Sequence, residues 1–245
     1  QAMKIFHQLG LCDYIIETFY NMAINAIMAE EYENATTYLE KTLYLLKINK
    51  KNSLRVCNIS KAIGMIALST FYQGRIYSTR NYLVKDGQFL DYIIEDDHDS
   101  NKNYLWDDDL FLYFICQALL CNYNGKYEEA IEIYERAEVY MNRSQGNYFF
   151  AYPQFCMAKQ YTLQQLGLEE ERLQLLEDYK KFCKKNGYLR HLQAVNRLIA
   201  GTDEDDNIDH DTLNCPIMNE VCEAERLRCI EREARSRRKE TQFFS

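Results

Sequence analysis

The sequence predicts an all-α protein built from paired helices, and three observations lead to this fold class. The chain has 245 residues, of which 47% are hydrophobic, so a sizeable core can be buried. Only 2 prolines and 9 glycines interrupt it, whereas an all-β chain needs turn residues every 8–12 residues or so. Apolar residues also recur at helical spacings through residues 1–200, as on one face of successive helices.

Residues 19–46 predict the first helical hairpin. Met22, Ala23, Ala26 and Ile27 share one face of a helix that ends at a polar break at residues 30–31. The second helix repeats the spacing at Tyr32, Ala35, Tyr38, Leu39 and Thr42. Because the break is so short, the two helices are expected to lie antiparallel.

Three more hairpins are predicted, and each contains a glycine where its first helix ends. They cover residues 53–92, 110–141 and 152–186, with turns at Gly74, Gly125 and Gly167. In the first of these, the expected packing positions are Ile63, Ala67, Phe71, Tyr77, Tyr82, Leu83, Phe89 and Leu90. In the last, they are Phe155, Ala158, Tyr161, Leu166, Leu173, Leu176, Tyr179 and Phe182.

The most specific pattern is GKYEEAIEIYERA at residues 125–137. Its Tyr127, Ala130, Tyr134 and Ala137, together with Ala118 in the preceding helix, resemble the tetratricopeptide repeat. Residues 19–46 resemble it too, except that Glu31 stands close to the place where the family usually has glycine. The alternative is an amphipathic helical hairpin of no particular family. The spacing between repeats is irregular, which indicates a divergent array.

The resemblance implies a right-handed α-α superhelix in which stacked hairpins share a core and enclose a groove. A peptide or protein ligand in that groove is the implied partner. In the family, polar residues on the inner face of the first helix contact ligands. The closest matches here are Asn21, Asn25 and Gln117.

The expected organisation is a repeat domain at 1–200, an acidic linker at 201–216 and a charged helix at 217–245. A second acidic stretch at 95–109 is expected to be a solvated loop, like the one at 202–211. A calcium site at Asp205, Asn207 and Asp209 is rejected, because an EF-hand would need glycine and glutamate where His210 and Pro216 stand. The apolar seam of the charged helix fits either a homodimeric coiled coil or a solvent-exposed helix.

The end of the chain, EARSRRKETQFFS at residues 233–245, resembles the linker before the dimerisation helix of bacterial sensor histidine kinases. That resemblance implies a regulatory input region, with kinase activity in a domain after Ser245. The rival interpretation takes the basic residues at 235–239 as a nucleic-acid contact or a targeting signal. Neither end looks like a natural terminus, and residues 2–10 look like the second half of a repeat that begins upstream.

Composition narrows the function classes. A net charge of −8 disfavours general affinity for nucleic acid or anionic membranes. Neither a signal peptide nor an apolar run of the roughly 20 residues that span a bilayer is apparent. Nine cysteines without a Cys-x-x-Cys pair indicate reduced thiols in the cytoplasm.

The sequence shows no phosphate-binding loop, metal-binding motif or nucleophile motif, so no enzyme, cofactor or metal is predicted. The expected function is a ligand- or protein-binding regulatory region of a larger bacterial signalling protein. The alternative is a stand-alone scaffold or adaptor.

Overall fold

The computed structural model describes residues 12–48, 55–95, 107–143 and 149–201. Within these ranges the chain forms nine helices and no strand, which confirms the predicted all-α class. The acidic linker at 201–216, apart from its first residue, and the charged helix at 217–245 lie outside the described residues, as does most of the acidic stretch at 95–109.

Eight of the helices follow one another as four closely connected pairs, and a ninth comes last. The pairs are α2 (Cys12–Met28) with α3 (Tyr32–Ile48), α4 (Arg55–Tyr72) with α5 (Ile76–Glu95), α6 (Asp107–Tyr123) with α7 (Tyr127–Arg143), and α8 (Tyr152–Gln165) with α9 (Glu169–Asn186). The last helix is α10 (Leu189–Ala200), which packs on α9. All four predicted hairpins are therefore present, with turns at the predicted positions.

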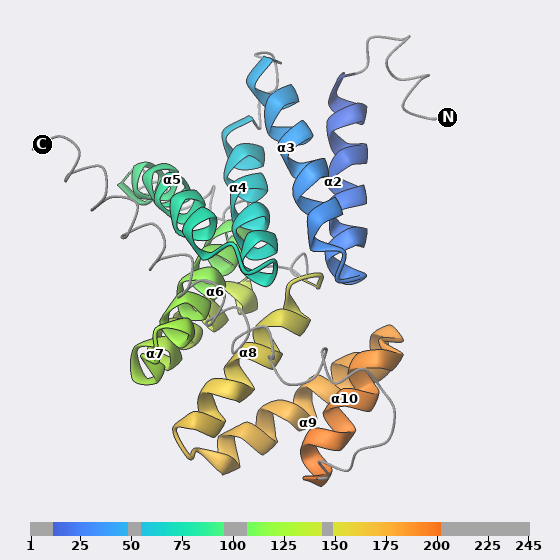
Figure 1. Cartoon of the computed structure of the whole chain (residues 1–245), viewed down its shortest axis with the longest axis vertical. Helices are drawn as coiled ribbons and strands as arrows, with labels where there is room; N and C mark the ends of the chain where they lie inside the picture. Colours follow the sequence, from blue (N-terminus) through green and yellow to red (C-terminus); the bar gives the residue numbers. More distant parts are fainter. Residues whose placement is uncertain (1–11, 49–54, 96–106, 144–148, 202–245) are drawn as a thin grey trace, which may run out of the picture.

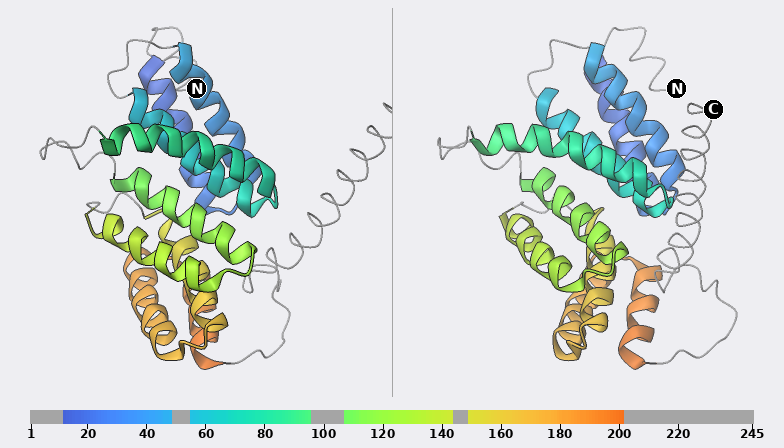
Figure 2. Two further views of the ribbon diagram at one scale, coloured as in Figure 1. Left: turned by 90° about the vertical axis from the view of Figure 1, so that its left-hand side faces the viewer. Right: turned by 60° about the vertical axis from the view of Figure 1, so that its left-hand side comes forward.

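The helices are arranged in chain order along the molecule. Figure 1 shows α2 and α3 at one end and α9 and α10 at the other. In both views of Figure 2, α5, α6 and α7 lie as successive layers between these ends. Pairs are joined by contacts of α3 with α4, α4 with α6, and α7 with α8, so α6 lies in the middle of the array.

One type of turn closes every hairpin. A residue with positive φ follows the first helix, one further residue follows it, and then the next helix begins. In the α6–α7 turn, the Gly125 amide donates to the Asn122 carbonyl at 2.9 Å, and the Lys126 amide to the Cys121 carbonyl at 2.9 Å. This is the Schellman arrangement, which satisfies carbonyls left over at the helix end.

Glycine occupies the positive-φ position in three of these hairpin turns, and glutamate in the fourth. Gly74, Gly125 and Gly167 have φ between 70° and 72°, whereas Glu30 has a φ of 62° in the α2–α3 turn. The same pair of hydrogen bonds forms there, from Glu30 and the residue after it. The position that glycine takes in the other three turns is thus held at residue 30 by a side chain that must accept a strained backbone.

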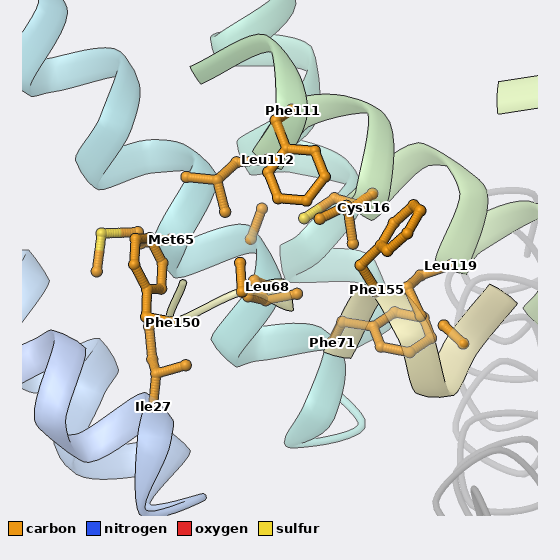
Figure 3. Close-up of a cluster of buried hydrophobic side chains, with 14 of the residues drawn as sticks. Ile27, Met65, Leu68, Phe71, Phe111, Leu112, Cys116, Leu119, Phe150 and Phe155 are labelled. Carbon is orange, nitrogen blue, oxygen red and sulfur yellow. The ribbon is translucent and has the colours of Figure 1, made fainter. Parts of the chain in front are cut away.

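A single hydrophobic core runs through the described helices. It contains side chains from the first pair, such as Ile27, and from the helix α8, such as Phe155, all nearly inaccessible to solvent. Figure 3 draws Phe150, from the turn before α8, in the same group of side chains as Ile27 of α2 and Met65 of α4. Small residues allow close approach: the Cys116 thiol of α6 reaches the Gly64 carbonyl of α4 at 3.8 Å.

Buried and half-buried polar side chains also join neighbouring helices. Asn122 of α6 donates to the Tyr134 hydroxyl of α7 at 3.2 Å and accepts from the Thr162 hydroxyl of α8 at 2.9 Å. The side-chain amide of Gln73, in the α4–α5 turn, donates to the backbone carbonyl of Tyr32 at 2.8 Å and to the hydroxyl of Thr36 at 2.7 Å, both in α3. The Asn122 amide is buried with its partners and the Gln73 amide is half-buried with its partners, so they help to fix the relative positions of three helices in the first case and two in the second.

Two predicted packing positions are wrong. Tyr77 is 60% exposed, and Leu173 is also exposed. The residue before Tyr77, Ile76, is only 2% exposed. Because successive helical residues differ by about 100° in direction, Ile76 takes the core position and Tyr77 points to solvent.

Candidate binding groove

An apolar groove lies on the first hairpin. It has a volume of about 540 Å³ and lies between α2 and α3. We call it the α2–α3 groove, and it is lined by Ile15, Phe19, Thr37, Glu40, Lys41, Tyr44 and Leu45.

The helical repeat explains why these residues share one surface. Ile15 and Phe19 are one turn apart on α2, and Thr37, Lys41 and Leu45 follow each other by single turns on α3. Because α2 and α3 are antiparallel, the first turns of α2 lie beside the last turns of α3. The groove therefore occupies the end of the hairpin at which α2 begins.

The groove faces away from the later helices. On α3, the buried residues Ala35, Leu39, Thr42 and Leu46 define the core direction. At about 100° per residue, the centre of the groove-lining set lies almost opposite to that direction. The core side is where α3 meets α4, and Tyr32 of α3 stacks there on Tyr72 with ring centres 4.9 Å apart.

Aromatic rings and one cation form part of the groove wall. The rings of Phe19 and Tyr38 stack with centroids 6.3 Å apart. The Lys41 ammonium lies 5.6 Å from the Phe19 centroid and 6.0 Å from that of Tyr38. This cation–π geometry holds the lysine stem along the apolar wall and leaves its charge at the rim, next to Glu40.

Large apolar side chains are unusually exposed around the groove. Tyr44, which lines it, is 65% exposed. Tyr14 and Ile48, at the same end of the hairpin, are 54% and 59% exposed. Exposed apolar side chains beside a groove are the kind of surface that another protein segment can contact. With two charges at its rim, the groove has the chemistry to receive an amphipathic helix.

The ligand contacts predicted from the family resemblance are not brought together in this groove. Asn21 and Asn25 are exposed on α2 but are not among the groove-lining residues. Gln117 is half-buried on α6, whose principal contacts are with α4, α5, α7 and α8. Sequence reasoning missed the groove itself. The available signal was the run of apolar and aromatic residues on the solvent side of α3, at Tyr44 and Leu45.

Three of the described cysteines, Cys121, Cys156 and Cys183, are poorly suited to act as nucleophiles. Cys116, Cys156 and Cys183 are buried, Cys121 is half-buried and Cys12 is exposed. Burial is the largest cause that raises the pKa of Cys121, Cys156 and Cys183 above its ordinary value. These three groups remain protonated thiols at neutral pH, in which form they are poor nucleophiles.

The described ranges contain neither a metal-binding cluster nor a membrane-spanning helix. No group of three or more histidine, cysteine or acidic side chains converges there as metal ligands would. Likewise, none of the helices described has the length and apolar character needed to cross a bilayer. Comparison of the chain with protein-family models, with curated proteins and with solved structures finds no match.

Proposed function

We propose that this chain is a binding module of tetratricopeptide-like helical hairpins that recognises a helical segment of a protein. The observation that carries the proposal is the α2–α3 groove, with its stacked Phe19 and its exposed Tyr44. The hairpin order and the family-like string at residues 125–137 support a superhelical array. In such an array, rigid hairpins present preformed surfaces, which lowers the entropic cost of binding.

The ligand best suited to the groove is an amphipathic helix. Its apolar side would cover Ile15 and Phe19, and its flanks would meet Lys41 and Glu40 at the rim. Anchors spaced three and four residues apart are the pattern that such a groove reads. Because the two rim charges are opposite in sign, the groove favours a helix that carries both signs along its edges.

A regulatory role remains a prediction from the C-terminal sequence. Residues 217–245, which supply the resemblance to a histidine-kinase linker, lie outside the described residues. The proposed switch is that ligand binding changes the curvature of the array and so the pairing of the charged helix, in a homodimer or within one chain. A stand-alone adaptor has the same groove without that coupling. Reading the coding sequence after Ser245 separates the two roles.

The binding proposal is tested with a display library of helical peptides selected against the chain. Selected peptides are measured by fluorescence anisotropy against two matched variants, Tyr44→Ala and Tyr77→Ala. Both tyrosines are about equally exposed, at 65% and 60%, but only Tyr44 lines the groove. We expect Tyr44→Ala to weaken binding about tenfold or more, as removal of an aromatic anchor does. Tyr77→Ala should leave it within about twofold. Equal effects, or no selectable peptide, would contradict the proposal.

A further inference from the structure

We propose that the exposed side of α5 is a second docking surface, and that it binds an acidic amphipathic helix of another protein. We define this α5 face by Tyr77, Arg80, Asn81, Val84 and Lys85, all of which are exposed. Their spacing places them on the side of α5 opposite to the buried residues Ile76, Thr79 and Leu83. The inference goes beyond the proposed function, because the α2–α3 groove lies on a different hairpin.

A comparison of equivalent positions in the four hairpins provides the first observation. The third and the tenth residues after the positive-φ residue of each turn lie one above the other on the solvent side of the second helix. In three hairpins both are glutamate: Glu33 and Glu40 in α3, Glu128 and Glu135 in α7, and Glu170 and Glu177 in α9. In α5 they are Tyr77 and Val84. A side of the helix that is acidic in the other hairpins is thus apolar on α5.

The exposure of these two apolar side chains is the second observation. Tyr77 is 60% exposed and Val84 is 63% exposed. They are separated by seven residues in the sequence, which is about 10 Å along a helix. A helix that lies along α5 has the same spacing, so it can place one apolar side chain on each of them. Tyr77 and Val84 are therefore suited to act as a pair of anchors.

The charges around the anchors are positive, which is the third observation. The segment RIYSTRNYLVK at residues 75–85 contains Arg75, Arg80 and Lys85 and no acidic residue, although the whole chain has a net charge of −8. At about 100° per residue, Arg80 lies on one side of the anchors and Lys85 on the other. The Arg80 guanidinium donates to the side-chain carbonyl of Asn124 at 3.2 Å. The Lys85 ammonium lies 5.2 Å from the centre of the Tyr82 ring. Both cations are thus held beside the anchors.

This combination identifies the chemistry of the partner. Two apolar anchors flanked by cations match a helix that has apolar residues seven apart and carboxylates along its edges. The glutamates at the equivalent positions of α3, α7 and α9 repel such a helix, which directs it to α5.

The two cations are not expected to contribute equally. Burial, and after it the charge of Glu40 of α3, raises the pKa of Tyr82, the residue on which Lys85 lies. The Glu40 carboxylate therefore acts on the Lys85 side of the α5 face, where it opposes an acidic ligand. Arg80 lies on the side of the next hairpin, where it contacts Asn124. The stronger contact of the ligand is expected at Arg80.

The test uses the full chain and a synthetic helical peptide that has leucines seven residues apart and glutamates on both sides of them. A matched peptide has lysine in place of every glutamate. Fluorescence anisotropy at low salt measures the affinity of both peptides. We expect the acidic peptide to bind about tenfold or more tightly than the lysine peptide. Its affinity should fall as the salt concentration rises.

Variants of the chain locate the binding surface. Tyr77→Glu and Val84→Glu give α5 the residues that the other hairpins have, so the fold should tolerate them, and circular dichroism checks that it does. Each should weaken binding of the acidic peptide about tenfold or more. Arg80→Gln should weaken it more than Lys85→Gln. The control is Tyr44→Ala in the α2–α3 groove, which should leave the affinity within about twofold.

The other outcomes overturn the inference. Equal affinity for the two peptides, no binding of either, or no effect of Tyr77→Glu in a folded chain would each do so. A loss of binding in Tyr44→Ala instead would place the acidic helix in the α2–α3 groove, which would support the proposed function and refute the α5 face. Self-association of the parent chain that Tyr77→Glu abolishes, measured by sedimentation velocity, would show that a second copy occupies the face. The display selection tests the groove with other peptides, so the two proposals can fail separately.

Discussion

Two equivalent turns give opposite predictions for the stability of the fold. Gly125 in the α6–α7 turn and Glu30 in the α2–α3 turn occupy the same Schellman position, with φ of 72° and 62°. Gly125→Ala places a side chain where glycine is favoured, and Glu30→Gly removes one from a strained position. We expect the first change to lower the free energy of unfolding and the second to raise it.

The magnitudes follow from the backbone. An L-residue in the left-handed region costs about 1–2 kcal/mol, and replacing glycine recovers about 0.4–1 kcal/mol by restricting the unfolded chain. A Cβ at Gly125 would meet no atom within 4 Å, so no steric cost is added. Gly125→Ala should therefore destabilise by roughly 1 kcal/mol, the difference of these two effects.

Glu30→Gly should give a gain of at least the same size. The backbone gain is again roughly 1 kcal/mol, since the same two effects act in reverse. Burial raises the pKa of Glu30, and nearby Arg190 of α10 opposes that rise. Removing the carboxylate relieves its desolvation and loses this attraction, which for a half-exposed pair is worth about 0–1 kcal/mol. Because the net shift of the pKa is upward, the desolvation is the larger effect, and the electrostatic change does not oppose the backbone gain.

Urea unfolding followed by far-ultraviolet circular dichroism measures both changes at neutral pH. Gly125→Ala is the control for the assay, because its cost arises from the backbone alone. If Gly125→Ala left stability unchanged, or if Glu30→Gly destabilised the chain by about 1 kcal/mol, the assignment of a common strained turn would be wrong.

Two further predictions concern groups away from the groove. Asn122→Ala should lower the free energy of unfolding by about 2–4 kcal/mol, because it removes hydrogen bonds that join three helices. The conservative Thr162→Val should lower it by about 1 kcal/mol. Urea midpoints measure both changes, and a loss at Asn122 no larger than the loss at Thr162 would argue against the network. Burial, then the charge of Arg190, lowers the pKa of His191 below its usual 6.5. The stability that its neutral ring contributes is therefore present above about pH 6.5 and is lost as pH falls through the folded-state pKa. Stability measured on both sides of pH 6.5 should fall less on acidification in His191→Gln than in the parent chain, and equal slopes would refute this.

The sequence was sufficient for the hairpins and for part of the core. Gly74, Gly125 and Gly167 mark turns because few other residues adopt positive φ, and Ala130 and Tyr134 occupy the packing positions that their spacing predicts. These features depend on neighbours within a few residues, so local patterns are enough to predict them.

Features that depend on tertiary placement were not predictable. Nothing in the residue type of Glu30 indicates a left-handed backbone, which the hairpin imposes through the hydrogen bonds of its turn. The groove depends on which side of α3 is left uncovered, and that is known only once α4 has been placed on the other side. Asn21 and Asn25 were selected by a family resemblance, whereas binding surfaces of divergent repeats follow from the surface that each chain exposes.

Phe150 has a consequence for how the molecule unfolds. In a stack where each hairpin touches only the next, the end units can fray independently. Here a residue from the turn before α8 shares a core with Ile27 of α2 and Met65 of α4. Loosening α2 therefore opens a core to which a segment more than 100 residues later in the sequence also contributes. The described array should open as one cooperative unit, with amides of α2 and α8 losing protection from exchange together.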